Sequence, residues 1–210
     1  DKFLIIDPFE INNSFGKTRT EFAGYTDLSL DITEKFNLNI GIRYEYDNLS
    51  KENYFSPRIS GSYKLDPLTS VNFAAGIYYQ LPEMLILASD SRNSNVKSEK
   101  ATHYILGITR YLSDDIKFTA EGYYKNLENL IVKPNSNNAF SENSGKGYAY
   151  GIDLSIIKKF VNNIYGQMNY SYGVAKLKNK SSEPYFNNDF NQPHIFNILV
   201  GYQFNDSWSV

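Results

Sequence analysis

The chain has 210 residues, a formal net charge of −2 at pH 7 and 16% aromatic residues, 18 of them tyrosines. The near-neutral charge gives no electrostatic basis for binding nucleic acid, and the absence of cysteine excludes disulfides, thiolate catalysis and cysteine-based metal sites. No apolar run approaches the roughly 18 residues of a membrane-spanning helix. Mean hydropathy is −0.45, a value that barrel strands also show, because their apolar residues alternate with polar ones.

The ends of the sequence do not look like the ends of a complete protein. The chain begins at Asp1, without an initiator methionine or a signal peptide, and it stops at Val210 inside a segment with strand character. We therefore expect residues 1–210 to be part of one domain of a longer mature protein. Residues 1–19 are expected to be irregular.

A period of two runs through most of the chain. Its clearest instance is residues 37–47, Asn-Leu-Asn-Ile-Gly-Ile-Arg-Tyr-Glu-Tyr-Asp, which alternate without exception. Because successive strand side chains point to opposite faces, this segment predicts a strand with one apolar and one polar face. About nine strands and a truncated tenth are expected, in chain order, at residues 21–32, 37–47, 58–65, 71–80, 102–112, 116–125, 150–156, 164–174, 196–204 and 207–210.

The connections between these strands alternate between short and long. Residues 81–101 form one long connection, whose Met-Leu-Ile-Leu run fits a short helix and a strand extension equally well. Short turns are expected near Glu34, Pro67, Asp114, Asn162 and Asp206. Long polar connections are expected at residues 48–56 around Ser50, at residues 81–101 around Asp90, at residues 126–146 around Asn137, and at residues 178–193 around Tyr185.

Both regularities are typical of an antiparallel transmembrane β-barrel. A tilted strand needs roughly 9 to 11 residues to cross a bilayer, and such barrels have short periplasmic turns and long extracellular loops. The strands of a soluble sandwich are shorter, typically about 5 to 6 residues. Tyrosines also gather toward the strand ends, as in the interfacial girdle of a barrel. The pattern therefore predicts an all-β fold that forms a segment of a membrane barrel.

Six short motifs occur in order along the chain. They are Gly41-Ile42-Arg43-Tyr44-Glu45, Ser56-Pro57-Arg58-Ile59, Tyr78-Tyr79-Gln80-Leu81-Pro82, the run from Lys97 to Gly107, Gly151-Ile152-Asp153-Leu154, and Asp189-Phe190-Asn191-Gln192-Pro193-His194. In this order and spacing, over about residues 20–205, they resemble the barrel of TonB-dependent outer-membrane receptors.

The resemblance implies a barrel of about 22 strands in the outer membrane of a Gram-negative bacterium. Such a receptor contains its own N-terminal plug domain and imports a scarce nutrient, of the siderophore, cobalamin or oligosaccharide class. The TonB complex supplies the energy by pulling on a segment that precedes the plug. Neither the plug, nor that segment, nor the closing C-terminal strand is recognisable in residues 1–210. The chain is therefore expected to supply part of the barrel wall, in contact with the plug, with outer-membrane lipid and with a small-molecule ligand.

The polar side of the strands supplies the candidate functional residues. Near the extracellular strand ends, Tyr78, Gln80 and Tyr123 face inward on the expected register and are candidate ligand contacts. The loop aromatics Tyr185 and Phe186, and Phe190 with them, could close over a ligand or pack the loop on itself. Charged residues on the same side are expected to contact the plug, neighbouring strands or water, and they are Arg43, Glu45, Arg58, Lys117 and Glu121.

Neither catalysis nor metal binding is expected from the sequence. No nucleophile and base form a recognisable pair, so we expect no enzymatic activity and no cofactor. His103 and His194 are far apart in the chain, and Asp114 with Asp115 fits a solvated turn better than a calcium site. The glycines that lie singly inside strands are expected to relieve crowding or to permit curvature. Two other functions also fit the alternation, a passive porin or barrel-type secretion channel, and a soluble β-rich adhesin.

Overall fold

The computed structural model describes residues 18–133, 140–189, 191–205 and 208–210. Residues 1–17 of the segment expected to be irregular lie outside these ranges, and so do Asn137, Phe190 and Asp206. The long strands are β1 (Glu21–Thr33), β2 (Phe36–Asp47), β3 (Glu52–Asp66), β4 (Thr69–Gln80), β5 (Glu99–Tyr111), β6 (Ile116–Val132), β7 (Glu142–Val161), β8 (Ile164–Lys178) and β10 (His194–Asn205). The shorter elements are α1 (Met84–Ser89), the 3-10 helix η1 (Ser91–Asn95), β9 (Phe186–Asn187) and β11 (Trp208–Ser209).

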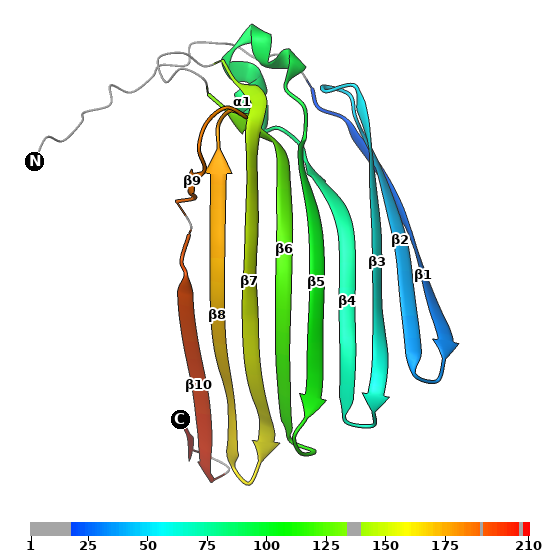
Figure 1. The fold of residues 1–210 in the computed structure, drawn as a ribbon, viewed down its shortest axis with the longest axis vertical. Coiled ribbons are helices and arrows are strands. Elements are labelled where there is room, and N and C mark those ends of the chain that lie inside the picture. Colours follow the sequence, from blue (N-terminus) through cyan, green and yellow to red (C-terminus); the bar gives the residue numbers. More distant parts are fainter. Residues whose placement is uncertain (1–17, 134–139, 190, 206–207) are drawn as a thin grey trace, which may run out of the picture.

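All the strands belong to one antiparallel sheet, in which strands that follow each other in the chain lie side by side (Figure 1). The order runs from β1 to β8 and continues with β10 and β11, while the short β9 pairs with β8. The expected all-β antiparallel architecture is confirmed.

Strand β2 forms where the alternation is cleanest. It pairs with β3 in an unbroken register from Phe36 opposite Tyr63 to Asp47 opposite Glu52. The turn before it is closed by Thr33, whose hydroxyl oxygen accepts the backbone N–H of Phe36 at 3.0 Å. Local turn chemistry and the period of two therefore act together to define the first hairpin.

The prediction of a long connection at residues 48–56 is wrong, because β3 already begins at Glu52. The chain reverses in a tight turn in which the Asp47 carbonyl accepts the N–H of Lys51 at 2.9 Å. Lys51 adopts a left-handed conformation there, with φ 54°. The period was hidden by the adjacent aromatic residues Tyr54 and Phe55, which point to opposite faces of β3.

Two further segments differ from the expected boundaries. Residues 126–132 and 142–146 continue β6 and β7 instead of forming a loop. Their pairing is interrupted at Leu130 by shifts in register, and Asn129 has a φ of 57°. These irregularities break the simple alternation that would have revealed the strands. In residues 81–101, the Met-Leu-Ile-Leu run forms α1, so the helical alternative was correct.

The two ends of the sheet carry different connections. Short turns join β1 to β2, β3 to β4, β5 to β6, and β7 to β8 at one end, which we call the turn end (Figure 1). At the other end, the loop end, lie α1 and η1 and the connections from β6 to β7 and from β8 to β10. Long loops are extracellular in outer-membrane barrels, so the barrel architecture expected from the sequence would place the loop end on the outside of the cell.

The molecule has almost no apolar interior. Among the described residues, the buried apolar side chains are Tyr54, Pro82, Leu87 and Val96, all toward the loop end. Large apolar side chains along the rest of the sheet remain exposed, such as Leu106 with 63% of its surface accessible. No described helix is long and apolar enough to span a membrane. The sheet therefore does not bury its apolar residues within itself.

Candidate functional site

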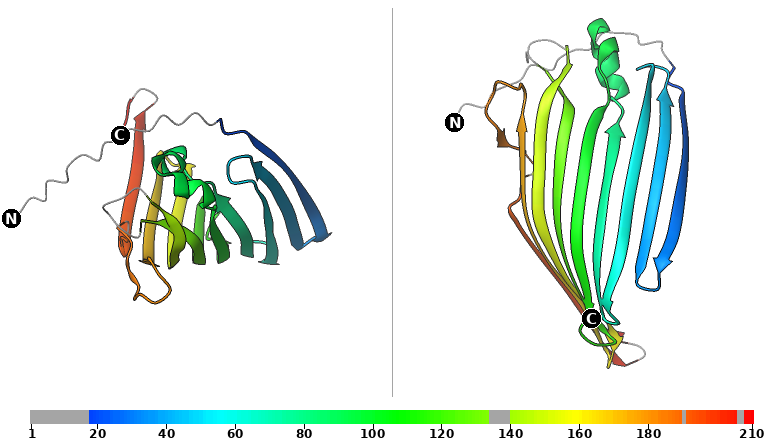
Figure 2. Two further views of the ribbon diagram at one scale, coloured as in Figure 1. Left: turned by 90° about the horizontal axis from the view of Figure 1, so that it is seen from above. Right: turned by 45° about the vertical axis from the view of Figure 1, so that its right-hand side comes forward.

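Polar and apolar side chains are segregated to opposite faces of the sheet. Residues directly opposite each other on paired strands share a face, which places Leu28, Ile40 and Ile59 on the apolar face. The sheet curves into an open arc with α1 inside it (Figure 2). Lys97, which follows η1, lies 2.9 Å from the carboxylate of Glu52 on the polar face. The polar face is therefore the concave one.

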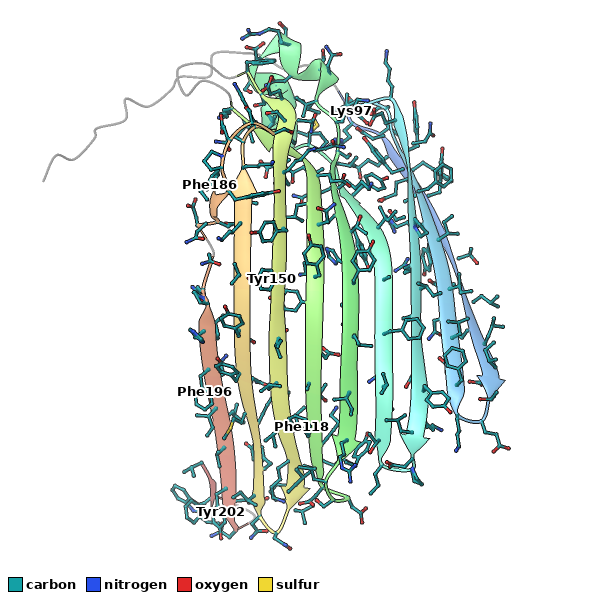
Figure 3. The ribbon with its side chains drawn as sticks, in the orientation of Figure 1. Lys97, Phe118, Tyr150, Phe186, Phe196 and Tyr202 are labelled. Carbon is teal, nitrogen blue, oxygen red and sulfur yellow. The ribbon has the colours of Figure 1, made fainter. Side chains whose placement is uncertain are left out.

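The convex apolar face carries aromatic residues near both ends. Toward the loop end, the Tyr44 ring lies 5.2 Å from that of Phe55. At the turn end, the Phe36 ring lies 6.4 Å from that of Tyr63, and Tyr202 occupies the corresponding end of β10 (Figure 3). Between these layers lie aliphatic side chains such as Ile40 and Leu154, together with some aromatic ones, such as Tyr170 opposite Leu154. This arrangement matches the lipid-facing surface of an outer-membrane barrel, with its two aromatic girdles.

A row of charged and polar residues, interrupted by two glycines, crosses the concave face. Going from β1 to β6, the opposite residues are Asp27, Gly41, Arg58, Gly76, His103 and Lys125. A Cβ atom at Gly41 would overlap Asp27 Oδ1 and lie 3.0 Å from Arg58 Nε. Because Gly41 has no side chain, Arg58 Nε reaches across β2 to within 3.5 Å of Asp27 Oδ1. Gly41 thus relieves crowding, as its single position in a strand suggested.

A hollow opens beside this row where β3 and β4 separate. Their pairing extends from the turn end only as far as Arg58 opposite Gly76, so the loop-end part of each strand pairs with its other neighbour. The hollow has a volume of about 220 Å³. It is lined by Arg43, Glu45, Ser56, Arg58, Tyr78 and Tyr79.

Ion pairs and aromatic contacts position the side chains around this hollow. Arg43 Nη2 donates to Glu45 Oε1 at 2.7 Å, so the two charges partly neutralise each other. The ring of Tyr78 lies 4.7 Å from that of His103 on the neighbouring strand. Within the part of the chain that the structure describes, Arg43 and Arg58 each have one carboxylate partner, and a guanidinium has five N–H donors. Donors therefore remain for a ligand or for another domain inside the barrel.

Tyr123 forms a second concave feature, further around the arc. Its hydroxyl lies 2.6 Å from where a Cβ of Gly151 would be, and 2.9 Å from that of Gly173. The tyrosine therefore lies flat across the two following strands, in space that only glycine leaves free. The ammonium of Lys125 lies 5.4 Å from its ring centroid, which is within the range of a cation–π interaction.

The candidate plug contacts are spread along the concave face. Arg43, Glu45 and Arg58 meet at the hollow near the loop end. Glu121 lies nearer the turn end, opposite Asp153, and Lys117 lies opposite Tyr111 in the last pair of the β5–β6 pairing. The structure thus brings three of the five residues together and leaves Glu121 and Lys117 apart from them.

The loop aromatics divide between the two faces. Tyr185 contacts Tyr148, with ring centroids 4.9 Å apart, on the convex face. Phe186 is paired with Leu177, a position on the concave face. Gln80, at the loop end of β4, shares the concave face with Tyr78. Sequence reasoning missed Ser56, Tyr79 and His103, although period-two counting alone would have put Ser56 and His103 on this face.

The connection between β4 and β5 is fixed in place by a buried asparagine. Asn93 is fully buried, and its side-chain amide donates to the Ile86 carbonyl at 2.7 Å. Its side-chain oxygen accepts the N–H of Ser141 at 2.8 Å. Nearby, hydrogen bonds from Arg92, chiefly from its side chain, lower the pKa of Asp90 to about 2. These contacts give the loop end a defined shape next to the hollow.

The described residues contain no group of three or more possible metal ligands. His103 lies on the concave face of β5, whereas His194 on β10 lies beside Tyr172 on the convex face. In the turn between β5 and β6, Asp115 accepts a hydrogen bond from Lys158. Because the two histidines lie on opposite faces of the sheet, they cannot bind the same metal ion.

A curved antiparallel wall with a lipid-type convex face and a polar concave face defines part of an outer-membrane β-barrel. The sequence matches the family described as "TonB dependent receptor-like, beta-barrel" over residues 2–210. The chain belongs to this family, whose members are receptors and transporters in the outer membrane of Gram-negative bacteria. No curated protein sequence matches the chain.

Solved structures with the same fold are TonB-dependent receptors. The ferric-catecholate import receptor Fiu of Escherichia coli K12 superposes with a TM-score of 0.73 at 19% identity, covering 90% of this chain and 32% of that one. The ferripyoverdine receptor of Pseudomonas aeruginosa gives 0.71 at 16%, covering 90% and 26%. The copper transporter OprC gives 0.70 at 16%, covering 91% and 34%. The chain thus spans about a third or less of each of these proteins.

Proposed function

We propose that the protein to which this wall belongs binds a scarce nutrient at the extracellular half of its lumen and imports it with energy supplied through TonB. The observation that carries the proposal is the concave hollow lined by Arg43, Arg58 and Tyr78. It combines guanidinium donors with aromatic rings on the side that faces the lumen, near the end that faces the outside. Membership of this family supports a receptor and transporter, and it gives no support to the alternatives of a passive porin or a soluble adhesin.

The chemistry of the hollow favours a ligand rich in oxygen acceptors. Guanidinium groups bind carboxylate and similar oxygens with geometric specificity, and tyrosine offers both an apolar ring and a hydroxyl. Metal-chelate siderophores, cobalamin and oligosaccharides all present such oxygens. Among these, the metal-chelate class receives further support from the ferric-catecholate and ferripyoverdine receptors that share the fold.

Within this proposal the concave residues have two roles. Tyr78, Gln80 and Tyr123 contact the ligand, with Phe186 approaching from the connection after β8. Tyr185 is left out, because it packs on the convex face. The lumen-facing charges that contact the plug domain or the neighbouring wall are Arg43, Glu45, Arg58, Lys117 and Glu121. The protein acts as a transporter without an enzymatic step, and TonB acts through its N-terminal region.

Uptake by cells that carry the full-length receptor tests the ligand site. A deletion strain is complemented with the unaltered gene, and uptake of a ferric catecholate, cobalamin and an oligosaccharide is compared. Tyr78→Ala should weaken binding of the transported compound about tenfold, from the loss of roughly 1.4 kcal/mol of ring contacts. Tyr111→Ala, on the same face at the turn end, is the control and should bind normally. Equal affinities of the two variants would exclude the hollow as the ligand site.

Deletion of TonB tests the energy source separately. Uptake should fall to background, whereas binding of the compound to the cell surface should persist. Uptake that continues at the same rate without TonB would show a passive channel and would contradict the proposal.

A further inference from the structure

The convex face of β7 and β8 carries three lysines at the loop end. Lys146 lies directly opposite Lys178, and Lys176 lies opposite Tyr148 one step further along the same face. Like charges directly opposite each other on a sheet are destabilising. Within the described part of the chain, no carboxylate forms an ion pair with any of the three, whereas Lys100 is paired with Glu128. The cluster therefore has positive charge available to an external anion.

An aromatic layer places these lysines at a definite depth. The rings of Tyr148 and Tyr150 stack at 6.2 Å with an interplanar angle of 13°, and Tyr148 meets Tyr185 edge to face. The ammonium of Lys178 lies 4.8 Å from the centroid of Tyr185. Tyrosine girdles mark the level of the lipid head groups in outer-membrane barrels. The lysines thus lie at, or just outside, the head-group layer of the outer leaflet.

An apolar hollow of about 500 Å³ lies on the same face, on the membrane side of this aromatic layer. Its floor is at Gly122, where an added Cβ would meet nothing closer than the Leu106 carbonyl oxygen at 3.9 Å. Tyr150 belongs both to the aromatic layer and to the rim of the hollow, so the two features are continuous. The side chains around the hollow include Tyr104, Leu106, Tyr124, Tyr150, Ile152 and Tyr172.

We infer that this surface binds a phosphate-bearing lipid of the outer leaflet, with its phosphate groups on Lys146, Lys176 and Lys178 and an acyl chain in the hollow at Gly122. Ammonium groups form charge-assisted hydrogen bonds with phosphate oxygens. An anion placed between the lysines also removes their mutual repulsion. The tyrosines between the two parts contact the sugar or glycerol region, where a ring with a polar hydroxyl is suited to both environments. This site is on the opposite side of the wall from the proposed nutrient site.

The test uses the full-length receptor purified in a nonionic detergent, with lipid A as the probe and binding measured by native mass spectrometry. The double variant Lys146→Gln/Lys176→Gln keeps the contact between Lys178 and Tyr185. A lysine near a charged lipid surface contributes about 1 kcal/mol, which is about fivefold in affinity, so the double variant should bind about 25-fold more weakly. The matched control Lys35→Gln/Lys159→Gln removes two exposed lysines at the turn end and should bind as the unaltered receptor does. Heat-modifiable gel mobility verifies that each variant is folded.

Two further comparisons separate a lipid site from a simple phosphate site. Dephosphorylated lipid A should bind as weakly to the unaltered receptor as lipid A binds to the double variant. Gly122→Leu, for which the hollow has room, should weaken lipid A binding severalfold. Inorganic phosphate at millimolar concentration should not displace the lipid. Any one of four results would overturn the inference. These are equal affinities of the double variant and its control, no preference for the phosphorylated lipid, displacement of the lipid by inorganic phosphate, and unchanged lipid A binding by Gly122→Leu.

Discussion

Replacing Leu154 with arginine should destabilise the barrel in a membrane, because the apolar face of β7 is in contact with lipid. Leu154 lies midway between two residues that mark the interfaces of the membrane. Four positions toward the loop end is Tyr150, which belongs to the aromatic layer, and four positions toward the turn end is Lys158, whose ammonium forms an ion pair with Asp115 in a turn. At about 3.3 Å per residue this is roughly 13 Å along the strand in each direction. With a tilt of about 40°, it corresponds to about 10 Å from each interface. An arginine so near the midplane costs about 2–4 kcal/mol.

The assay is a urea titration of the full-length receptor folded into phosphatidylcholine vesicles, followed by heat-modifiable gel mobility. The free energy of unfolding is obtained by linear extrapolation. Asp153→Arg is the matched control, because it adds the same side chain one position away on the concave face, opposite Glu121. Its change should stay below about 1 kcal/mol. If Leu154→Arg and Asp153→Arg cost the same, the assignment of the convex face to lipid is refuted.

Two predictions concern the loop end. Asn93→Leu removes the side-chain hydrogen bonds to the part-buried Ile86 carbonyl and to the buried N–H of Ser141. A buried backbone group left without its partner costs about 1–3 kcal/mol, so amide hydrogen exchange in α1 and η1 should accelerate at least about tenfold. Asn95→Leu, at an exposed position, should leave the exchange unchanged. The pKa of Asp90 is lowered from 3.8 to about 2, so its contact with Arg92 should persist as the pH falls below 4 and be lost only near pH 2. The carboxyl carbon shift of labelled Asp90 should show this midpoint, and Arg92→Gln should move it back toward 3.8. A midpoint near 3.8 in the unaltered receptor, or equal exchange in the two asparagine variants, would contradict these contacts.

The two-faced wall could be predicted from the sequence because its cause is local. A side chain's face depends only on its position in the period of two, and in β2 that period has no interruption. Arg43 and Glu45 could therefore be placed on the polar face without knowing which strands lie beside them. The short turns, such as the one closed by Thr33, could be located because only a few residues separate one alternating segment from the next.

The hollow could not be predicted, because it depends on the relations between strands. Arg58 meets Asp27 only because the registers of two successive hairpins place Gly41 between them. The separation of β3 from β4 near Tyr78 is likewise invisible in either strand alone. The shape of the loop end rests on Asn93, which contacts a segment nearly fifty residues away. Such long-range hydrogen bonds leave no periodic signal in the sequence.

The glycines of the sheet show how the same residue type serves both faces of one wall. On the concave face, side chains of neighbouring strands converge, and Gly41 and Gly151 provide the space in which Arg58 and Tyr123 reach across a strand. On the convex face at Gly122 the side chains diverge, and the missing side chain leaves a hollow instead of a contact. Gly41 and Gly151 therefore allow close contacts on the side of the wall that faces the lumen, whereas Gly122, which faces lipid, makes room for a bound chain.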